Sequence, residues 1–336
     1  SYQYAHAETY GNGDSYSYQY AHAGTHSDAS VGTGYPSGTG DSGMIEGIIV
    51  RALSGFYDVD TGETEIRCRA RGKFRKDGIT PLVGDRVRLQ QSGDTGILYE
   101  ILPRNNAFVR PAVANLDTLV MLASQVTPVT EPFLIDRVAA IAAQQQVELM
   151  LVLNKCDLNT AEELFAIYRD TGIAVFRLSA ATGDGVEELR GALRGKLAAF
   201  TGNSGVGKST LLNTLFPQAN MPTGDVSEKL GRGRHTTRHV ELFSLPDGTR
   251  IMDTPGFSAF DTNQMDLGTP EQLALAFPEF APYLGACRFD DCKHIKEQGC
   301  AVLEALSAGK IHPSRHESYV RLYETIKEQK PWEQKR

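Results

Sequence analysis

The sequence predicts a multidomain protein with an all-β barrel, an α/β domain and a helical, metal-binding domain, in that order. Short alternating apolar runs between turn signals indicate the barrel over residues 44–104. Apolar strands that alternate with helical stretches indicate a parallel sheet over residues 112–265. Within residues 268–336, three of the chain's five cysteines cluster beside a histidine, which is typical of a metal site in a reducing compartment.

Residues 1–43 differ from the rest of the chain. They are rich in Gly, Ser, Tyr, Thr and His, and they repeat SYQYAHA at Ser1–Ala7 and Ser17–Ala23. A segment that almost lacks Leu, Ile and Val cannot bury enough apolar surface to offset the entropy lost on ordering. We therefore expect a disordered, low-complexity leader, with Met44 as the start of the folded protein. A tail whose Tyr and His residues bind a partner is the alternative.

The barrel prediction rests on short runs that are apolar or alternate between apolar and polar residues. They lie at Ile45–Leu53, Glu65–Ala70, Asp85–Gln90 and Gly96–Ile101. Turn signals separate them at Asp60–Gly62, Asp77–Gly78 and Ser92–Gly93. So many short strands in so little chain favour a small closed barrel.

The α/β prediction rests on four strand–helix pairs and one hairpin. The pairs are Leu116–Ala123 with Pro132–Gln146, Val147–Leu153 with Ala161–Asp170, Ala174–Leu178 with Gly185–Leu193, and Lys196–Thr201 with Lys208–Phe216. The hairpin spans His239–Asp253 and turns at Pro246–Gly248. Strands that alternate with helices of this length form βαβ units around a parallel sheet.

The strongest motif, GNSGVGKST, falls where the last of these strands meets its helix. Glycines let backbone N–H groups turn toward phosphate oxygens, Lys208 reaches the β- and γ-phosphates, and Ser209 offers a hydroxyl to Mg²⁺. An incidental glycine-rich turn is the alternative. We expect a nucleotide phosphate site made of Gly202, Asn203, Ser204, Gly205, Val206, Gly207, Lys208, Ser209 and Thr210.

A second motif predicts which base is bound. Asn154, Lys155 and Asp157 follow directly on an apolar strand, in the pattern NKCD. A carboxylate there can accept two hydrogen bonds from the N1–H and N2–H₂ edge of guanine, which adenine cannot supply. After the next strand, Ser179 and Ala180 are expected to supply a backbone N–H for the guanine carbonyl. The two motifs together predict a guanine nucleotide site.

Two further segments are expected to sense the γ-phosphate. In DTPG, Asp253 can hold Mg²⁺ through water and the Gly256 N–H can contact the γ-phosphate. Upstream, the basic loop Gly231–Thr237 carries two threonines that can close onto Mg²⁺. Thr237 is the preferred ligand, and Thr236 is the alternative.

The residue after DTPG does not offer a group that can position the attacking water. Phe257 follows DTPG, and its side chain cannot polarise water, so we expect slow intrinsic hydrolysis. His235 in the basic loop is the candidate catalytic residue. Binding phosphate or packing are the alternative roles for this histidine.

The C-terminal cluster contains Cys287, Cys292, His294 and Cys300. Three thiolates and one imidazole make a closed tetrahedral set, which is typical of structural zinc. Buried free cysteines beside an unrelated histidine are the alternative.

A run of cations in the barrel predicts RNA binding. If residues 67–75 are one strand, its period of two places Arg67, Arg69, Arg71, Lys73 and Arg75 on one face. Such a row of charges repels itself unless a polyanion or acidic partners compensate, so phosphate binding is expected. A solvated strand face is the alternative. The formal net charge of −7 argues only against a protein that coats nucleic acid with its whole surface.

The guanine motifs stand before the phosphate loop, the threonines and DTPG, whereas ordinary GTPases carry them last. A sheet protein tolerates such a permutation when its original termini are close in space. In this order of NKCD, SA, GNSGVGKST, GRGRHTT and DTPGF, the chain resembles the circularly permuted, small-ribosomal-subunit-dependent GTPases of bacteria. The similarity covers nearly all of Met44–Lys330, and only residues 1–43 depart from it.

The resemblance implies an oligonucleotide-binding-type (OB) barrel, a permuted GTPase domain and a helical zinc domain. It also implies a role in late maturation of the 30S small ribosomal subunit, whose binding through 16S rRNA stimulates GTP hydrolysis. Two other functions remain open: an RNA-binding structural protein that uses GTP only for stability, and a GTPase switch with a protein partner. We expect no membrane segment, because the apolar runs are too short to span a bilayer. No charged-then-apolar leader opens the chain, so we expect a cytoplasmic protein, and we expect it to be a monomer.

Overall fold

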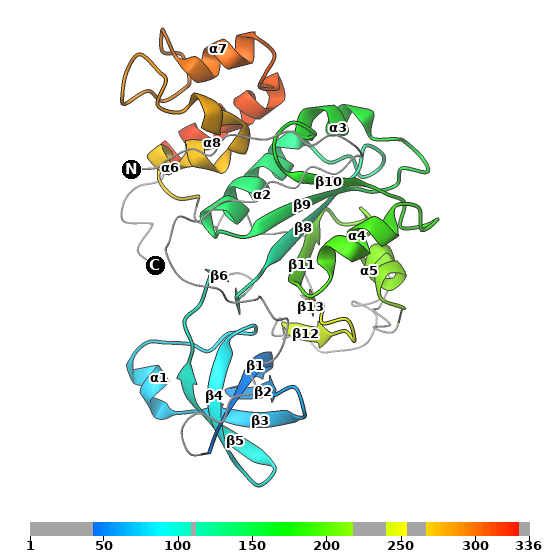
Figure 1. The fold of residues 1–336 in the computed structure, drawn as a ribbon, viewed down its shortest axis with the longest axis vertical. Helices are drawn as coiled ribbons and strands as arrows, with labels where there is room; N and C mark the ends of the chain where they lie inside the picture. Colours follow the sequence, from blue (N-terminus) through cyan, green and yellow to red (C-terminus); the bar gives the residue numbers. More distant parts are fainter. Residues whose placement is uncertain (1–42, 109–111, 218–239, 254–266, 329–336) are drawn as a thin grey trace, which may run out of the picture.

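The computed structural model describes residues 43–108, 112–217, 240–253 and 267–328. A β-barrel lies at one end of the molecule, an α/β domain in the middle and a helical domain at the other end (Figure 1). The predicted fold class is confirmed. The expected leader at residues 1–43 lies outside the described part of the chain, apart from Gly43.

The barrel has five strands in the spatial order β1-β2-β3-β5-β4, and β4 pairs back onto β1 to close it. Only the β3–β5 pairing is parallel. Inward side chains such as Ile49, Val59 and Leu98 are fully buried. A five-stranded closed barrel of this kind has the OB architecture. The strands are β1 (Met44–Leu53), β2 (Phe56–Asp60), β3 (Glu65–Ala70), β4 (Arg86–Ser92) and β5 (Thr95–Ile101).

The cationic run does not form one strand, so the prediction of a single charged face is wrong. Strand β3 ends at Ala70, and a short helix, α1 (Gly72–Lys76), follows. Phe74 is the buried residue of α1, and it anchors the helix to the barrel core. Arg67 and Arg69 therefore lie on the outer face of β3, Arg71 caps α1, and Lys73 and Arg75 lie on the helix.

The α/β domain is built on a sheet of order β10-β9-β8-β11-β13-β12, in which every strand except β12 is parallel. Its strands are β8 (Thr118–Ala123), β9 (Glu148–Leu153), β10 (Ala174–Arg177), β11 (Leu197–Gly202), β12 (Glu241–Ser244) and β13 (Arg250–Asp253). Its helices are α2 (Pro132–Gln144), α3 (Glu162–Tyr168), α4 (Val186–Leu193) and α5 (Lys208–Leu215). The predicted strand–helix pairs and hairpin are confirmed.

Both faces of this sheet are covered, which explains why its strands are apolar throughout. Leu119 and Met121 of β8 belong to the core beneath α2 and α3. Their neighbours Val120 and Leu122 belong to the second core, together with residues of α4 and α5. These two helices lie on the opposite face of the sheet from α2 and α3 (Figure 1). The period of two along β8 thus supplies two separate cores from one strand.

A tightly hydrogen-bonded linker joins the barrel to the α/β domain. It contains the small hairpin β6 (Ala107–Phe108) and β7 (Val113–Ala114). At its start, Arg104 pairs with the fully buried Asp85 carboxylate at 2.7 and 2.8 Å. The Asn106 side chain then exchanges two hydrogen bonds with the backbone of Leu116, at 2.8 and 3.0 Å. These contacts fix where the barrel sits on the linker.

The helical domain docks on α2 and α3 through a buried ion-pair network. It comprises α6 (Pro270–Leu273), the 3₁₀ helices η4 (Ala274–Ala276) and η5 (Pro278–Tyr283), α7 (Ala301–Ser307) and α8 (Pro313–Glu328). Arg315 of α8 contacts Asp136 of α2 at 2.5 Å and Glu279 of η5 at 2.6 and 3.1 Å. The Tyr168 hydroxyl donates to the same Asp136 oxygen at 2.7 Å. Because Arg315 and Asp136 are fully buried, this pairing is needed to offset the cost of removing their charges from water.

Within the described ranges, no helix combines the length and the apolar character that crossing a bilayer requires.

Candidate active site and metal centre

The phosphate-loop motif lies at the carboxyl end of the central strand β11. The strand ends at Gly202, and α5 begins at Lys208, so the loop between them leads into a helix N-terminus. Gly202 and Gly207 adopt φ angles of +145° and +102°. A side chain would clash at either position, because a Cβ would lie 2.5 Å from the Leu122 carbonyl at Gly202 and 2.3 Å from the Asn154 amide at Gly207. The loop therefore keeps the close backbone turn that a phosphate site requires.

Asn154 joins three of the predicted segments. Its side-chain N–H donates to the Val206 carbonyl at 2.8 Å, and its oxygen accepts from the Ala180 N–H at 2.9 Å. Only 3% of the residue is exposed. The NKCD loop, the phosphate loop and the SA segment are therefore held in one place by a single buried amide.

Lys155 crosses the phosphate loop. Its ammonium donates to the Gly205 carbonyl at 2.9 Å and to the Thr127 carbonyl at 2.6 Å. The second contact involves the loop after β8, which the sequence analysis did not include in the site. This loop also approaches Gly205 through Pro128. Its position beside the phosphate loop was foreseeable only once β8 was known to pair with β11.

Asp157 is exposed at the end of the NKCD loop, so its carboxylate is accessible to a ligand. The SA segment differs from its expected role. The Ser179 N–H donates to the Asp184 carbonyl at 2.9 Å, and the Ala180 N–H is bonded to Asn154. In this structure the segment braces Asn154 instead of presenting these N–H groups to a base.

The first turn of α5 carries Lys208, Ser209 and Thr210, where Lys208 and Ser209 are half-buried. One turn further on, the Thr214 hydroxyl donates to the Ala180 carbonyl at 3.0 Å, which ties the helix to the SA segment. The amino end of α5 is thus fixed relative to both the phosphate loop and the NKCD loop.

The γ-phosphate side of the site is described only in part. The backbone of Asp253 ends β13, which pairs with β11, so this residue lies at the same sheet edge as the phosphate loop. His235, Thr236, Thr237 and Gly256 lie outside the described residues.

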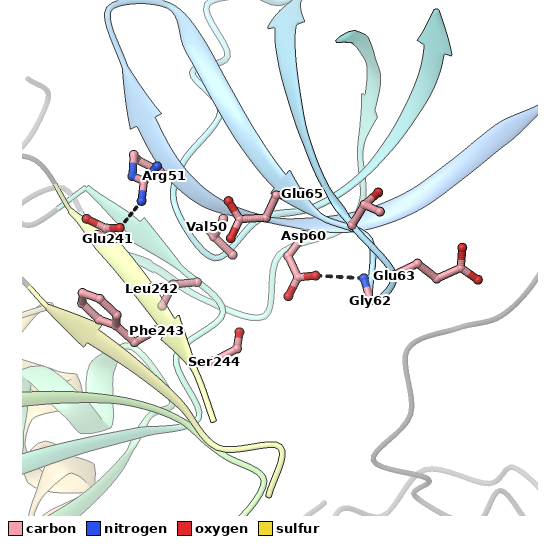
Figure 2. A pocket seen from close by; sticks show the side chains of 11 residues that line it. Val50, Arg51, Asp60, Gly62, Glu63, Glu65, Glu241, Leu242, Phe243 and Ser244 are labelled. Carbon is pink, nitrogen blue, oxygen red and sulfur yellow. Dashed lines mark hydrogen bonds and ion pairs between the residues drawn. The ribbon is translucent and has the colours of Figure 1, made fainter. Parts of the chain in front are cut away.

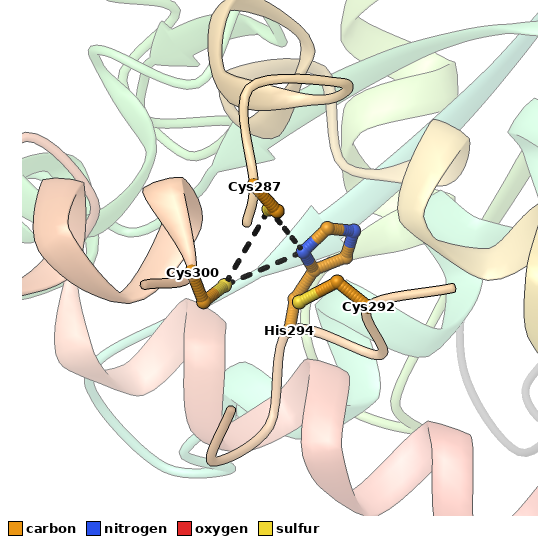
Figure 3. A group of neighbouring side chains, drawn as sticks. All are labelled: Cys287, Cys292, His294 and Cys300. Atoms are coloured by element: carbon orange, nitrogen blue, oxygen red, sulfur yellow. Dashed lines mark hydrogen bonds between the residues drawn. The ribbon is translucent and has the colours of Figure 1, made fainter. Parts of the chain in front are cut away.

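The four predicted metal ligands converge in the helical domain (Figure 3). All their ligand atoms lie within 4.8 Å of one another. His294 Nδ1 is 3.5 Å from the sulfur of Cys287 and 3.5 Å from that of Cys300, and these two sulfurs are 3.9 Å apart. Tetrahedral zinc with Zn–S of about 2.3 Å and Zn–N of about 2.0 Å requires S···S near 3.8 Å and N···S near 3.5 Å. The cluster formed by Cys287, Cys292, His294 and Cys300 therefore has the spacing to hold one zinc ion.

The surroundings of this cluster orient its ligands. His294 has a φ of +60°, and its carbonyl is 2.8 Å from His316 Nε2 on α8. The Tyr319 hydroxyl donates to the Lys293 carbonyl at 2.9 Å. These contacts attach the ligand loop to the same helix that carries Arg315, so the metal centre and the docking network share one rigid support.

Burial makes the cluster unfavourable for charge without a cation. Burial raises the pKa of Cys292 to about 12 and raises that of Cys300, while it lowers the pKa of His294. Protonated thiols and a neutral imidazole are the forms that this environment favours. A divalent cation reverses the preference of the thiols, because a coordinated thiol loses its proton.

Replacing Asp157 by Asn tests how the base is read. The change turns an acceptor into a donor facing N1–H of guanine, and it should move preference from GTP toward xanthosine triphosphate. Two hydrogen bonds to a charged group are worth about 1.5–3 kcal/mol each, so the GTP/XTP affinity ratio should change by at least about a hundredfold. Competition binding measures this ratio, with the exposed Asp170→Asn as control. A ratio that stays at the wild-type value would show that Asp157 does not read the base.

Metal analysis tests the cluster. Protein purified without chelator should contain one zinc per chain, and Cys292→Ser should remove it while Cys68→Ala, in the barrel, leaves it in place. Loss of a structural zinc should abolish hydrogen-exchange protection in residues 287–300, because such ions contribute directly to folding. Zinc-free protein with an ordered 287–300 segment would contradict the assignment.

Comparison with known proteins agrees with this geometry. A family model described as RsgA GTPase matches residues 101–263, and one described as RsgA N-terminal domain matches residues 46–97. The small ribosomal subunit biogenesis GTPase RsgA of Geobacillus sp. (strain WCH70) is 44% identical over 295 residues, which are 86% of this chain and 99% of the relative. Its counterpart in Caldanaerobacter subterraneus is 43% identical over 289 residues, or 84% and 96% of the two chains.

Solved structures show the same similarity. YjeQ from Thermotoga maritima superposes with a TM-score of 0.73 at 33% identity, covering 85% of this chain and all of that one (100%). YloQ, described as a circularly permuted GTPase, gives 0.71 at 34% identity, with 88% and 99% covered. Since the motifs stand in the permuted order and relatives match over almost their whole length, the chain belongs to the RsgA GTPase family and is a GTP hydrolase.

Proposed function

We propose that this GTP hydrolase acts in late maturation of the small ribosomal subunit, where it binds 16S rRNA through its barrel and hydrolyses GTP faster when bound. The relatives are named as small-subunit biogenesis GTPases. The observation in this chain that carries the proposal is a surface of stacked cations and aromatic rings on the outside of the barrel. We further propose that the protein acts in the cytoplasm as a monomer.

We assign the roles of the nucleotide-site residues from the sequence motifs, and the contacts of Asn154, Lys155 and the phosphate loop support this assignment. Residues 202–210 cradle the phosphates, with Lys208 on the β- and γ-phosphates and Ser209 on Mg²⁺. Asp157 reads guanine, while Asn154, Lys155, Ser179 and Ala180 hold the loops around the base. Thr236, Thr237, Asp253 and Gly256 complete the Mg²⁺ and γ-phosphate side, where Thr237 binds Mg²⁺ and His235 is the candidate that orients the attacking water.

The zinc is structural in this proposal. The cluster offers four protein ligands and therefore a closed coordination shell, whereas catalytic zinc sites keep one position open. By holding the ligand loop on α8, the ion supports the domain that docks on α2 through Arg315.

The barrel surface consists of Phe56, Arg69, Arg71, Ile97 and Tyr99, and we call it the barrel platform. The Arg69 guanidinium lies 4.6 Å from the Phe56 ring centre, and that of Arg71 lies 4.3 Å from the Tyr99 ring centre. Phe56, Arg69 and Ile97 are aligned across β2, β3 and β5 by strand register. Aromatic rings and guanidinium planes stack on unpaired bases, and arginines contact phosphates, so the platform suits single-stranded RNA.

This surface separates the proposal from its alternatives. A solvated charged face does not account for the exposed apolar side chains of Phe56 and Ile97. Stacked RNA bases would remove these side chains from water. A protein partner without RNA does not need cations stacked on rings. A protein that uses GTP only for stability would instead bind small subunits with an affinity that does not depend on the nucleotide.

The triple variant Phe56→Ala, Arg69→Ala, Arg71→Ala tests the platform. Wild-type GTP turnover should rise on addition of purified small subunits, and the triple variant should need a higher subunit concentration for the same rise. Each lost phosphate contact should also flatten the log–log salt dependence of binding by about 0.7. The double variant Arg169→Ala, Lys310→Ala removes the same charge elsewhere and should behave as wild type. Turnover that ignores subunits would contradict the proposed function, and an unchanged slope in the triple variant would contradict RNA binding at the platform.

A further inference from the structure

A single backbone pairing joins the barrel to the GTPase sheet within the described residues. Strand β1 pairs with β12 in antiparallel orientation, and the register places Arg51 of the barrel opposite Glu241 of the sheet. Their side chains form an ion pair across the junction (Figure 2). This backbone pairing and ion pair join the two sheets into one continuous order of strands.

The junction lies at a particular end of the β12–β13 hairpin. Glu241 is the first residue of β12, and its partner in β13 is Asp253, the last residue of that strand. In the sequence, the threonines Thr236 and Thr237 precede β12, and Gly256 follows β13. Arg51 thus contacts the hairpin at its open end. In the sequence, this end adjoins the two segments that are predicted to contact the γ-phosphate and Mg²⁺.

Arg51 also contacts an acid on β2, Asp58. Its guanidinium contacts Asp58 at 3.1 Å through one nitrogen and Glu241 through another. On its other side, Asp58 accepts from Arg67 at 2.9 and 3.3 Å. Burial alone raises the pKa of Asp58, but its hydrogen bonds to Arg67 and Arg51 outweigh this and hold the pKa below its ordinary value. Asp58 is therefore a buried anion held between two arginines.

These contacts form a continuous ionic chain, Arg67–Asp58–Arg51–Glu241. Its outer member, Arg67, has 57% of its side chain exposed and lies 6.0 Å from the ring centre of Phe56 in the barrel platform. Its inner member, Glu241, is paired by backbone with Asp253. The chain leads from the proposed RNA surface to the edge of the nucleotide site.

We propose that Arg51 and Glu241 are positioning residues for GTP hydrolysis: their ion pair holds the end of the β12–β13 hairpin against the barrel and so couples RNA on the barrel to the γ-phosphate side of the site. This inference rests on the proposed binding of RNA by the barrel. It assigns subunit stimulation to a defined contact within the chain.

The coupling follows from competition for charge. Arg67 lies beside the barrel platform, so an RNA phosphate bound there can attract the Arg67 guanidinium away from Asp58. Arg51 is then the arginine that still contacts Asp58. The Arg51 guanidinium is then redistributed between Asp58 and Glu241, and the backbone pairing transmits the change to Asp253. Since coupling between sites is reciprocal, exchange of GDP for GTP must in turn alter the environment of Asp58 and Arg67.

Charge reversal at Glu241 tests the proposal. Glu241→Lys places a cation against Arg51. Both residues line a pocket between the barrel and β12, and Glu63→Lys makes the same change on an exposed residue of that pocket (Figure 2). The maximal ratio of subunit-stimulated to basal turnover should fall by about fivefold or more in Glu241→Lys, at the low end of typical allosteric coupling. The subunit concentration for half-maximal stimulation should stay near that of wild type, because the platform is intact. Glu241→Asp, which keeps the charge, should retain most of the stimulation.

Hydrogen exchange without subunits separates this proposal from the proposed function. Replacing GDP by a non-hydrolysable GTP analogue should change exchange at Glu241–Ser244 and at Phe56–Asp60 in wild type, and only at Glu241–Ser244 in Glu241→Lys. If subunits fail to stimulate the wild-type protein, the proposed function fails. The hydrogen-exchange comparison then still tests whether the Arg51–Glu241 ion pair couples the barrel to the β12–β13 hairpin. Full stimulation in Glu241→Lys, an equal loss in Glu63→Lys, or no response at Phe56–Asp60 in wild type would overturn the proposal.

Discussion

Two hydrogen bonds from one buried side chain hold the nucleotide site together. Asn154 bonds to the phosphate loop 52 positions later in the sequence and to the SA segment 26 positions later. Gly207 must lack a side chain because the Asn154 amide occupies that space. The NKCD loop, the phosphate loop and the SA segment are thus held together by one side chain. Lys155 adds a second clamp over Gly205, so the site is preorganised by the protein itself.

The sheet explains why the permuted order does no harm to this arrangement. The motifs lie at the carboxyl edge of β9, β10, β11 and β13, and strand order in space decides which loops meet. In the permuted order, each end of the GTPase domain is connected to another domain. The barrel enters through β8 and touches β12, and the helical domain leaves after β13 and returns to α2 through Arg315. Each module therefore contacts a different part of the same sheet domain.

Much of this could be predicted from the sequence because its signals are local. The strand–helix alternation, the glycine-rich loop and the spacing of Cys287 to Cys300 each lie within a short stretch of chain. The failures involve contacts between different elements of the fold. Strand β2 is not among the predicted runs, and its Asp58 is paired across strands with Arg51 and Arg67. The cationic run bends at Arg71 because Phe74 fills the barrel core. Arg315 finds Asp136 across 179 positions, a pairing that no local pattern indicates.

The most direct test of the central role of Asn154 is the affinity of Asn154→Ala for GTP. The change leaves the Val206 carbonyl and the Ala180 N–H without this partner, and each unmade buried hydrogen bond costs about 1–3 kcal/mol. Calorimetric titration should therefore show GTP affinity reduced by about tenfold or more, in a protein whose circular dichroism remains that of wild type. Wild-type affinity for GTP in a folded Asn154→Ala protein would contradict the view that this side chain assembles the site.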